Sequence, residues 1–263
     1  MNTSTETGAP SGAVAPAVRL FVTAALAPDA VIVLEPEQAH YLTHVMRRGT
    51  GDTVALFNGR DGEWRARLER TGRHGASAHV GARLRPQGTE PDVWLLFAPI
   101  KRARLDYLVE KATELGVAAL LPVITRRTVV ERVNVERLAA HAREAAEQTE
   151  RLSVPVVHAP RPLDAIIASW PPERRLLLCD ESGAGAPIVT ALGQRGAAAA
   201  PWAVAIGPEG GFDASERAAL AALPQALPVG LGPRLLRADT AALAALACWQ
   251  AVLGDWHKAP RAG

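Results

Sequence analysis

The chain has 263 residues, of which 48% are hydrophobic and 21% are charged. This length supports one large domain or two smaller ones, and the composition excludes wholesale disorder. The net charge of +2 does not by itself predict nucleic-acid binding, which requires basic residues clustered on one face. The two cysteines, Cys179 and Cys248, lie far apart in the sequence, so we expect neither a metal site nor a disulfide framework.

The two ends of the chain carry no targeting or membrane signal. Residues 1–16 are rich in Ser, Thr, Gly, Pro and Ala and lack the basic start and apolar core of a signal peptide, so we expect a disordered tail. The most apolar helical segment, Ala241–Leu253, is too short to span a bilayer. We therefore expect a cytoplasmic protein that does not contact membranes.

The first folded segment, residues 17–86, contains short β-like runs separated by turn signals such as Asn58–Gly62. One short helix, Pro36–Met46, interrupts them. Several short strands joined by tight turns predict a small β-barrel. The expected strands are Arg19–Thr23, Ala30–Leu34, Thr53–Phe57, Glu63–Glu69 and Ala76–Leu84.

A linker follows, and residues 92–263 then alternate apolar strands with helices. This order predicts an α/β domain whose parallel sheet is covered on both faces. One helix has its apolar residues between Leu105 and Leu115 and ends at Gly116, and a longer one runs from Val135 to Leu152 with Asn134 as its N-cap. The expected strands are Val93–Ala98, Val117–Ile124, Leu176–Asp180 and Ala203–Ile206.

The segment Gly207–Gly211 joins an apolar strand to a helix that opens at Asp213 with capping-box spacing to Glu216. Glycines let a ligand approach the bare backbone, and amides ahead of a helix favour an anion or an acceptor. A plain strand-to-helix turn is the alternative interpretation. The segment is neither a phosphate loop nor a dinucleotide-binding fingerprint.

A second turn lies in Leu231–Ala241, where Gly232 and Pro233 precede two arginines and a carboxylate at the start of the last helix. Either these charged groups form a binding site, or Asp239 or Thr240 only caps the helix while the arginines are solvated. Capping and function are compatible, because a helix start is also a binding site.

Basic residues follow the first two strands of this domain: Lys101, Arg102 and Arg104 after one, Arg126 and Arg127 after the other. In a parallel sheet both groups lie beyond the carboxyl ends of the strands, where ligands bind. Further candidates for contacts or packing are Arg47 and Arg48 at the end of the first helix, His40 and His44 within it, and Glu144, Glu147, Gln148 and Arg151 on the long helix. No third ligand accompanies the histidines, so we expect no metal.

Together these stretches resemble the RsmE-type 16S ribosomal RNA uridine N3-methyltransferases of the SPOUT superfamily. One departure is Asp239, where the family more often has Glu. The matching segments occur in the family's order: His40–Arg47 with Gly51 and Asp52, Lys101 with Arg104–Gly116, Pro122–Val130, Glu144–Gln148 with Arg151, Ile206–Phe212 and Leu231–Ala241.

The resemblance implies a PUA-like RNA-binding barrel over residues 17–86 and a trefoil-knotted SPOUT methyltransferase domain over residues 92–263. It also implies S-adenosylmethionine as cofactor, a homodimer, and 16S ribosomal RNA or the small ribosomal subunit as substrate, methylated at N3 of a uridine. The alternatives are a SPOUT methyltransferase that acts on another RNA or base, and a non-catalytic RNA-binding protein.

Site residues follow from the two turns and the basic groups. The N3 proton must leave, so either a carboxylate such as Asp239 or Glu209 is a general base, or an arginine such as Arg237 or Arg127 stabilises the uracil anion, the route that we favour. We expect Arg237, Asp239 and Arg127 to be catalytic, and Arg47, Lys101, Arg104 and Arg151 to bind RNA. The expected cofactor residues are Gly207, Glu209, Gly210, Gly211, Leu231, Gly232, Leu235, Leu236 and Thr240.

Overall fold

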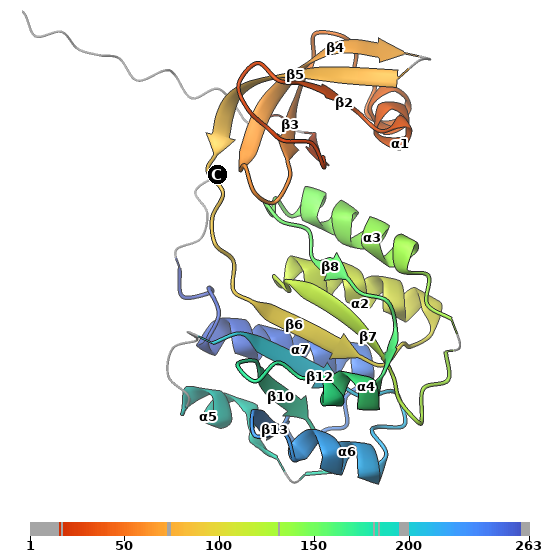
Figure 1. The fold of residues 1–263 in the computed structure, drawn as a ribbon, viewed down its shortest axis with the longest axis vertical. Helices are drawn as coiled ribbons and strands as arrows, with labels where there is room; N and C mark the ends of the chain where they lie inside the picture. The colour runs from red at the N-terminus through yellow and green to blue at the C-terminus, as the bar shows by residue number, and fades with distance from the viewer. Residues whose placement is uncertain are drawn as a thin grey trace, which may run out of the picture. The chain divides into compact units, whose positions relative to one another are not determined.

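The computed structural model describes residues 16, 18–72, 75–130, 132–180, 182–183, 185–194 and 200–258. Apart from Pro16, the predicted tail lies outside these ranges. The chain divides into two units, which we call unit 1 (Met1–Gly88) and unit 2 (Thr89–Gly263), and Figure 1 shows each with its own sheet. Within the described ranges, every helix is too short or too polar to span a bilayer.

Unit 1 is built on a five-stranded sheet with the order β1-β3-β4-β5-β2. β1 pairs with β3 in parallel, and the other neighbours are antiparallel. All five predicted strands are confirmed, with small shifts of their ends. The strands are β1 (Arg19–Phe21), β2 (Val31–Val33), β3 (Thr53–Phe57), β4 (Glu63–Gly72) and β5 (Gly75–Arg85).

The predicted helix of unit 1 is present but irregular. An α-helical turn, α1 (Pro36–His40), continues as a π-helix, η1 (Tyr41–Val45), in which the amide of Met46 donates to the carbonyl of Tyr41 at 2.9 Å. The wider turn keeps Leu42 fully buried, and the imidazole rings of His40 and His44 stack with their centroids 4.3 Å apart.

A buried carboxylate ties three parts of unit 1 together. Glu63 is 3% exposed and accepts hydrogen bonds from Nε of Arg19 at 2.5 Å and Nε of Arg85 at 2.6 Å. Burial alone would raise the pKa of Glu63, but the hydrogen bonds from Arg85 and Arg19 outweigh it and hold the pKa below its ordinary value of 4.5. The ion pairs therefore join β1, β4 and β5.

Unit 2 contains a parallel sheet with the order β11-β13-β10-β12-β6-β7-β8, and β9 also pairs with β7. Each pairing of these strands is parallel, as predicted. The strands are β6 (Val93–Phe97), β7 (Ala119–Ile124), β8 (Val156–Val157), β9 (Arg161–Pro162), β10 (Arg175–Cys179), β11 (Ala186–Pro187), β12 (Trp202–Ile206) and β13 (Ala226–Gly230).

Helices cover both faces of this sheet, which explains why its strands read as continuous apolar runs (Figure 1). In β6, Leu95 and Phe97 pack into one core with helices α2, α3, α5 and α7, whereas Leu96 packs into a second core with α4 and α6. The helices are α2 (Arg102–Glu114), α3 (Val135–Gln148), α4 (Leu163–Ala168), α5 (Ile188–Gly193), α6 (Ala214–Ala221) and α7 (Ala238–Val252).

The predicted ends of the two first helices of unit 2 are partly confirmed. Gly116 follows α2 at a φ of +83°, and the side chain of Asn134 accepts from the amide of Arg137 at 2.9 Å. The predicted end of α3 is wrong: the helix stops at Gln148, and Glu150 adopts a φ of +61°. Arg151 therefore lies beyond the helix rather than on its face.

Replacing Glu63 by Gln should destabilise unit 1 by about 3 kcal/mol, because two guanidinium groups lose their buried carboxylate. Because the pKa of Glu63 is lower in the folded state, its ionised carboxylate stabilises the fold at pH values above the unfolded pKa. This contribution is lost as pH falls through the folded pKa, so the difference in unfolding free energy between wild type and variant should shrink in acid. Hydrogen exchange of the β4 and β5 amides in the full chain measures the free energy of unfolding of unit 1. Glu69→Gln, exposed on the same strand, is the matched control, and an equal loss there would contradict the assignment.

Candidate functional site

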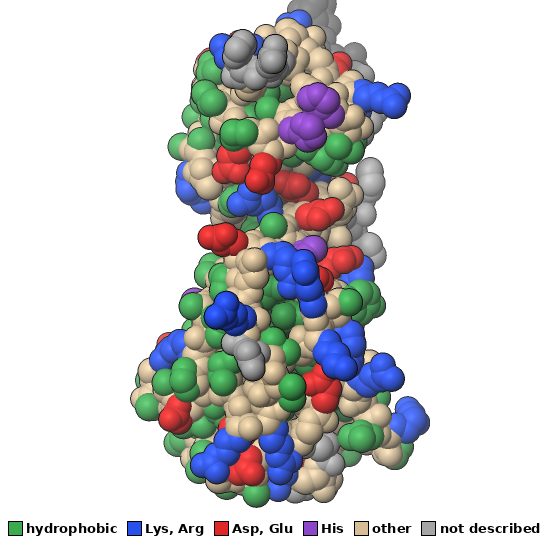
Figure 2. All heavy atoms as spheres, turned by 90° about the vertical axis from the view of Figure 1, so that its right-hand side faces the viewer, with side chains coloured by type: hydrophobic (Ala, Val, Ile, Leu, Met, Phe, Trp, Pro, Cys, Tyr) green, Lys and Arg blue, Asp and Glu red, His purple; other side chains and the backbone are tan. Residues whose placement is uncertain are grey.

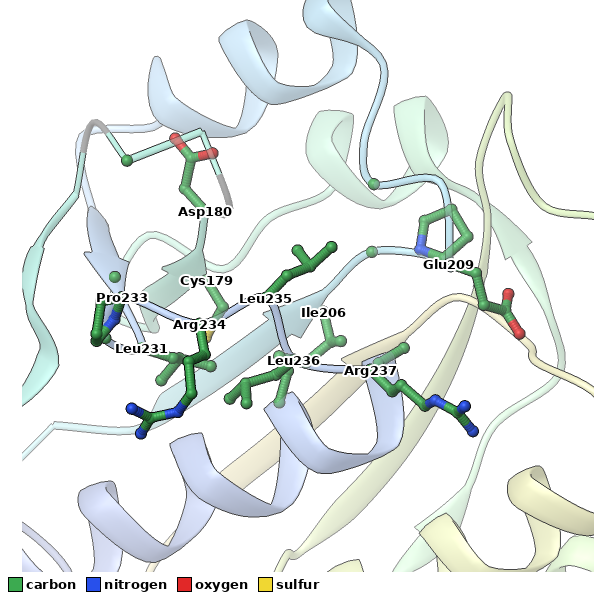
Figure 3. Close-up of a pocket in the computed structure, with 18 residues that line it drawn as sticks. Cys179, Asp180, Ile206, Glu209, Leu231, Pro233, Arg234, Leu235, Leu236 and Arg237 are labelled. Atoms are coloured by element: carbon green, nitrogen blue, oxygen red, sulfur yellow. The ribbon is translucent and has the colours of Figure 1, made fainter.

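A cavity of about 490 Å³ opens in unit 2 where β10, β12 and β13 end and α7 begins (Figure 3). This volume is within the range of small-molecule sites. Its centre is apolar, with Ile206, Leu231 and Leu236 grouped together, while Asp180 lies at one end and Glu209 at the other. The cavity therefore offers an apolar wall between two carboxylates.

Glycines shape both turns that border the cavity. Gly211 has a φ of +69° and Gly232 a φ of +97°, which are left-handed backbone conformations that residues other than glycine rarely adopt. A Cβ atom on Gly207 would lie 3.1 Å from the amide nitrogen of Phe212. The predicted capping box of α6 is confirmed: Asp213 accepts from the amide of Ser215, and Glu216 accepts from the amide of Asp213, both at 3.0 Å.

Most of the residues expected to bind a cofactor line this cavity. Those residues are Gly207, Glu209, Gly211, Leu231, Gly232, Leu235 and Leu236. Gly210 and Thr240 are not among the lining residues: the carbonyl of Gly210 accepts from Nη1 of Arg127 at 2.7 Å, and Thr240 is exposed in the first turn of α7.

Sequence reasoning missed Cys179 and Asp180, which line the cavity from the end of β10. The available signal was the end of the predicted strand 176–180, because parallel neighbours end at one edge of a sheet. Burial raises the pKa of Cys179 to about 12, so its thiol is neutral and forms part of the apolar wall. The carboxylate of Asp180 accepts from the amide and hydroxyl of Ser182 at 2.9 and 2.8 Å.

One interpretation of the sequence was that Asp239 caps α7, and the structure shows that it does not. The helix begins at Ala238 with Arg237 as its N-cap residue, and Asp239 lies in the first turn. Its carboxylate accepts from Nε of Arg104 at 2.9 Å and from Nη2 at 2.5 Å. The hydrogen bonds from Arg104 hold the pKa of Asp239 below its usual value, so the carboxylate is ionised and a weak base.

The arginines expected at the site fall into two classes. Arg104 is bonded to Asp239, and Arg127 donates to Gly210 and lies 3.7 Å from Asp213, so both are engaged within unit 2. Arg237 is exposed at the cavity, and no described residue receives a hydrogen bond or ion pair from its guanidinium. Arg237 is therefore available to a ligand, as is Arg234, which also lines the cavity and is exposed.

Arg151 is not available for the RNA contact expected of it. Its side chain is 8% exposed and donates to the carbonyls of Thr113 at 2.7 Å and Val117 at 3.1 Å, and it also pairs with Glu90. The position beyond the end of α3 explains this, because the side chain turns onto the connection between α2 and β7.

Among the described residues, no three His, Cys, Asp or Glu side chains gather as a metal site.

Two family models match the chain. The model described as an RNA methyltransferase domain matches residues 88–250, and the model described as an RNA methyltransferase PUA domain matches residues 34–80. The first match covers most of unit 2, including the cavity, and the second lies within unit 1.

Two solved structures are similar over nearly the whole chain. One is a ribosomal RNA small subunit methyltransferase E from Neisseria gonorrhoeae bound to S-adenosyl methionine, with a TM-score of 0.81 and 26% identity, covering 91% of this chain and 99% of that one. The other is a putative methyltransferase from Legionella pneumophila in complex with the bound cofactor SAM, with a TM-score of 0.79 and 28% identity, covering 90% and 98%.

Named relatives agree with the family models. The ribosomal RNA small subunit methyltransferase E of Rickettsia conorii is 31% identical over 235 residues, which cover 87% of this chain and 93% of the relative. The protein of the same name from Synechocystis is 34% identical over 245 residues, covering 90% and 78%. The chain therefore belongs to the ribosomal RNA small subunit methyltransferase E family.

Proposed function

We propose that the protein transfers a methyl group from S-adenosylmethionine to N3 of a uridine in the 16S RNA of the small ribosomal subunit. The observation that carries this proposal is the glycine-bordered cavity of unit 2, in a chain that belongs to a family of ribosomal RNA methyltransferases. The similar structures with bound S-adenosylmethionine support the choice of cofactor.

The residues of the cavity fit S-adenosylmethionine. Leu231, Leu236 and Ile206 provide an apolar wall for the adenine, and the glycine turns leave backbone amides and carbonyls open to its polar edge. The carboxylates of Asp180 and Glu209 complement a ligand that carries a sulfonium and an ammonium group. When bound, the cofactor supplies an electrophilic methyl group, and the chain has to align that group with the acceptor nitrogen.

The proposed reaction also requires the uridine to lose its N3 proton. The neutral imide is a poor nucleophile, and N3 lies on the Watson–Crick edge, so the base must be unpaired or flipped when it reacts. Arg237 borders the cavity near Glu209, and its cation would stabilise negative charge on the uracil oxygens (Figure 3). Arg127 supports the same site by holding the carbonyl of Gly210.

The finer architecture belongs to the same proposal. We infer that the strands of unit 1, within residues 17–86, close into a PUA-like RNA-binding barrel, and that residues 92–263 form a trefoil-knotted SPOUT domain that acts as a homodimer. The PUA match supports the RNA-binding assignment of unit 1, and the RNA methyltransferase match supports the methyltransferase assignment of unit 2. A ribosomal RNA substrate supports a cytoplasmic location for the protein.

RNA contacts are proposed for exposed basic side chains in both units, with Arg47 in unit 1 and Lys101 in unit 2 as the first candidates. Figure 2 shows that Lys and Arg side chains occur in small groups over one face, several of them beside Asp or Glu. Arg104 and Arg151 are left out of this surface, because their guanidinium groups are already bonded within unit 2.

Incubation of the protein with small ribosomal subunits and methyl-labelled S-adenosylmethionine should yield labelled 3-methyluridine in the 16S RNA. Nuclease digestion and mass spectrometry of the nucleosides identify the product. Transfer RNA and large subunits are the matched negative controls. A labelled nucleoside other than 3-methyluridine would favour a different RNA methyltransferase, and cofactor binding without any transfer would favour a non-catalytic RNA-binding protein.

Replacing Arg237 by Ala should lower the single-turnover rate of methyl transfer by roughly 10²–10³-fold, the usual effect of removing one group that stabilises developing negative charge. Cofactor affinity should change little, because the positive charge acts on the uracil. Arg217→Ala, a half-buried position on α6 that does not line the cavity, is the control and should keep its rate. Equal rates for Arg237→Ala and wild type would refute the role of Arg237.

A further inference from the structure

One guanidinium group in unit 2 connects two segments that border the cavity. Arg104 lies in the first turn of α2, Asp239 in the first turn of α7, and Glu209 in the turn after β12. We propose that Arg104 is a positioning residue of the cofactor site, which holds the start of α7 and the Gly207–Gly211 turn in a fixed relation. The inference rests on the proposed function and assigns a new role to a residue outside the cavity lining.

The geometry of the contact supports this role. Nε and Nη2 of Arg104 donate to the two carboxylate oxygens of Asp239 at 2.9 and 2.5 Å, a bidentate arrangement that fixes distance and angle together. The third nitrogen, Nη1, lies 3.7 Å from Oε1 of Glu209. All three nitrogens of one planar group thus face carboxylates on two different segments.

Burial makes the contact more than a surface ion pair. The side chain of Asp239 is 15% exposed and that of Arg104 is 27% exposed, whereas that of Glu209 is 43% exposed. Surface ion pairs contribute little, but a partly buried bidentate pair is both stronger and more directional. The contact of Arg104 with Asp239 is therefore the stronger one, and its contact with Glu209, in the turn after β12, is the weaker one.

The consequence for the cavity follows from the neighbours of Asp239. Arg237, Ala238 and Ala241 all line the cavity from the start of α7, and Asp239 lies among them. Oδ1 of Asp239 also accepts from the amide of Thr240 at 2.9 Å, so the carboxylate is tied to the backbone of that turn. Without Arg104, the carboxylates of Asp239 and Glu209 would lose the cation that both contact, and the electrostatic attraction that links the two segments would be lost.

The same geometry gives Asp239 and Arg104 roles other than those expected from the sequence. Both oxygens of Asp239 accept hydrogen bonds from Arg104, and its pKa is lowered, so this carboxylate positions the helix start and is a weaker base than an unpaired carboxylate. Arg104 donates two hydrogen bonds to Asp239 and lies 3.7 Å from Glu209, so we assign it to positioning rather than to an RNA phosphate.

The test is calorimetric titration of the full chain with S-adenosylhomocysteine, whose sulfur is uncharged, so that a change in cavity charge has little direct effect. Arg104→Gln should weaken affinity about tenfold, as expected for the loss of coupling between contacting residues. Arg104→Lys should recover only part of it, since Lys cannot form the bidentate contact. Arg102→Gln, which removes the same charge from an exposed neighbour, should bind as wild type does.

A double-mutant cycle separates positioning from a general loss of stability. Asp239→Asn should weaken S-adenosylhomocysteine binding by a similar factor, and Arg104→Gln with Asp239→Asn should be no weaker than either single variant. Additive losses, or unchanged affinity in a folded Arg104→Gln protein, would overturn the proposal. If Arg104→Gln does not fold, the affinities of Arg104→Lys and Asp239→Asn decide in the same way.

RNA binding provides the second readout. The slope of log affinity against log salt should be the same for Arg104→Gln and wild type, whereas loss of a phosphate contact would reduce it by about 0.7–0.9. A reduced slope would return Arg104 to the RNA surface. If wild type itself fails to bind S-adenosylhomocysteine, the proposed function is wrong. If wild type and Arg104→Gln bind it equally well, only the positioning role of Arg104 is wrong.

Discussion

Parallel pairing within the sheet of unit 2 is the constraint on which the site depends. β10 pairs with β12 and β13, and β12 pairs with β6, so four strands end at one edge although their sequences are far apart. That edge brings Cys179, Gly207 and Leu231 to one cavity. The location of the site is therefore set by the strand order of the sheet, which brings these distant segments together, and their side chains then line the cavity.

Charge is distributed unevenly around this edge. Two of the basic side chains after β6 and β7 are engaged inside unit 2: Arg104 with Asp239, and Arg127 with Gly210. Asp180 and Glu209 line the cavity, where a cationic cofactor would meet them. Arg234 and Arg237 differ from these residues, since both border the cavity and stay exposed. This distribution favours the route in which an arginine stabilises the uracil anion over one in which Asp239 removes the proton.

The sequence predicted the longer elements well, missed the strands β8, β9, β11 and β13 and the helices α4 and α5 of unit 2, and predicted side-chain partners poorly. Continuous apolar runs such as Val93–Phe97 identified the buried parallel strands, and glycines identified both turns of the cavity. The sequence could not reveal that Arg104 contacts Asp239, because the two residues meet only through the packing of α2 beside α7. Nor could it reveal the early end of α3, where a left-handed Glu150 turns Arg151 inward. Local patterns predict local structure, whereas ion pairs between distant segments depend on the assembled fold.

Hydrogen exchange with and without S-adenosylhomocysteine tests the central claim, that the two glycine-bordered turns of unit 2 form the cofactor site. The account predicts slower exchange at the non-proline backbone amides of the two turns, residues 207–211 and 231–238, which contribute most of the cavity lining, and unchanged exchange in the β3–β5 strands of unit 1. Protection confined to unit 1, or none at either turn under conditions in which the ligand is bound, would contradict it.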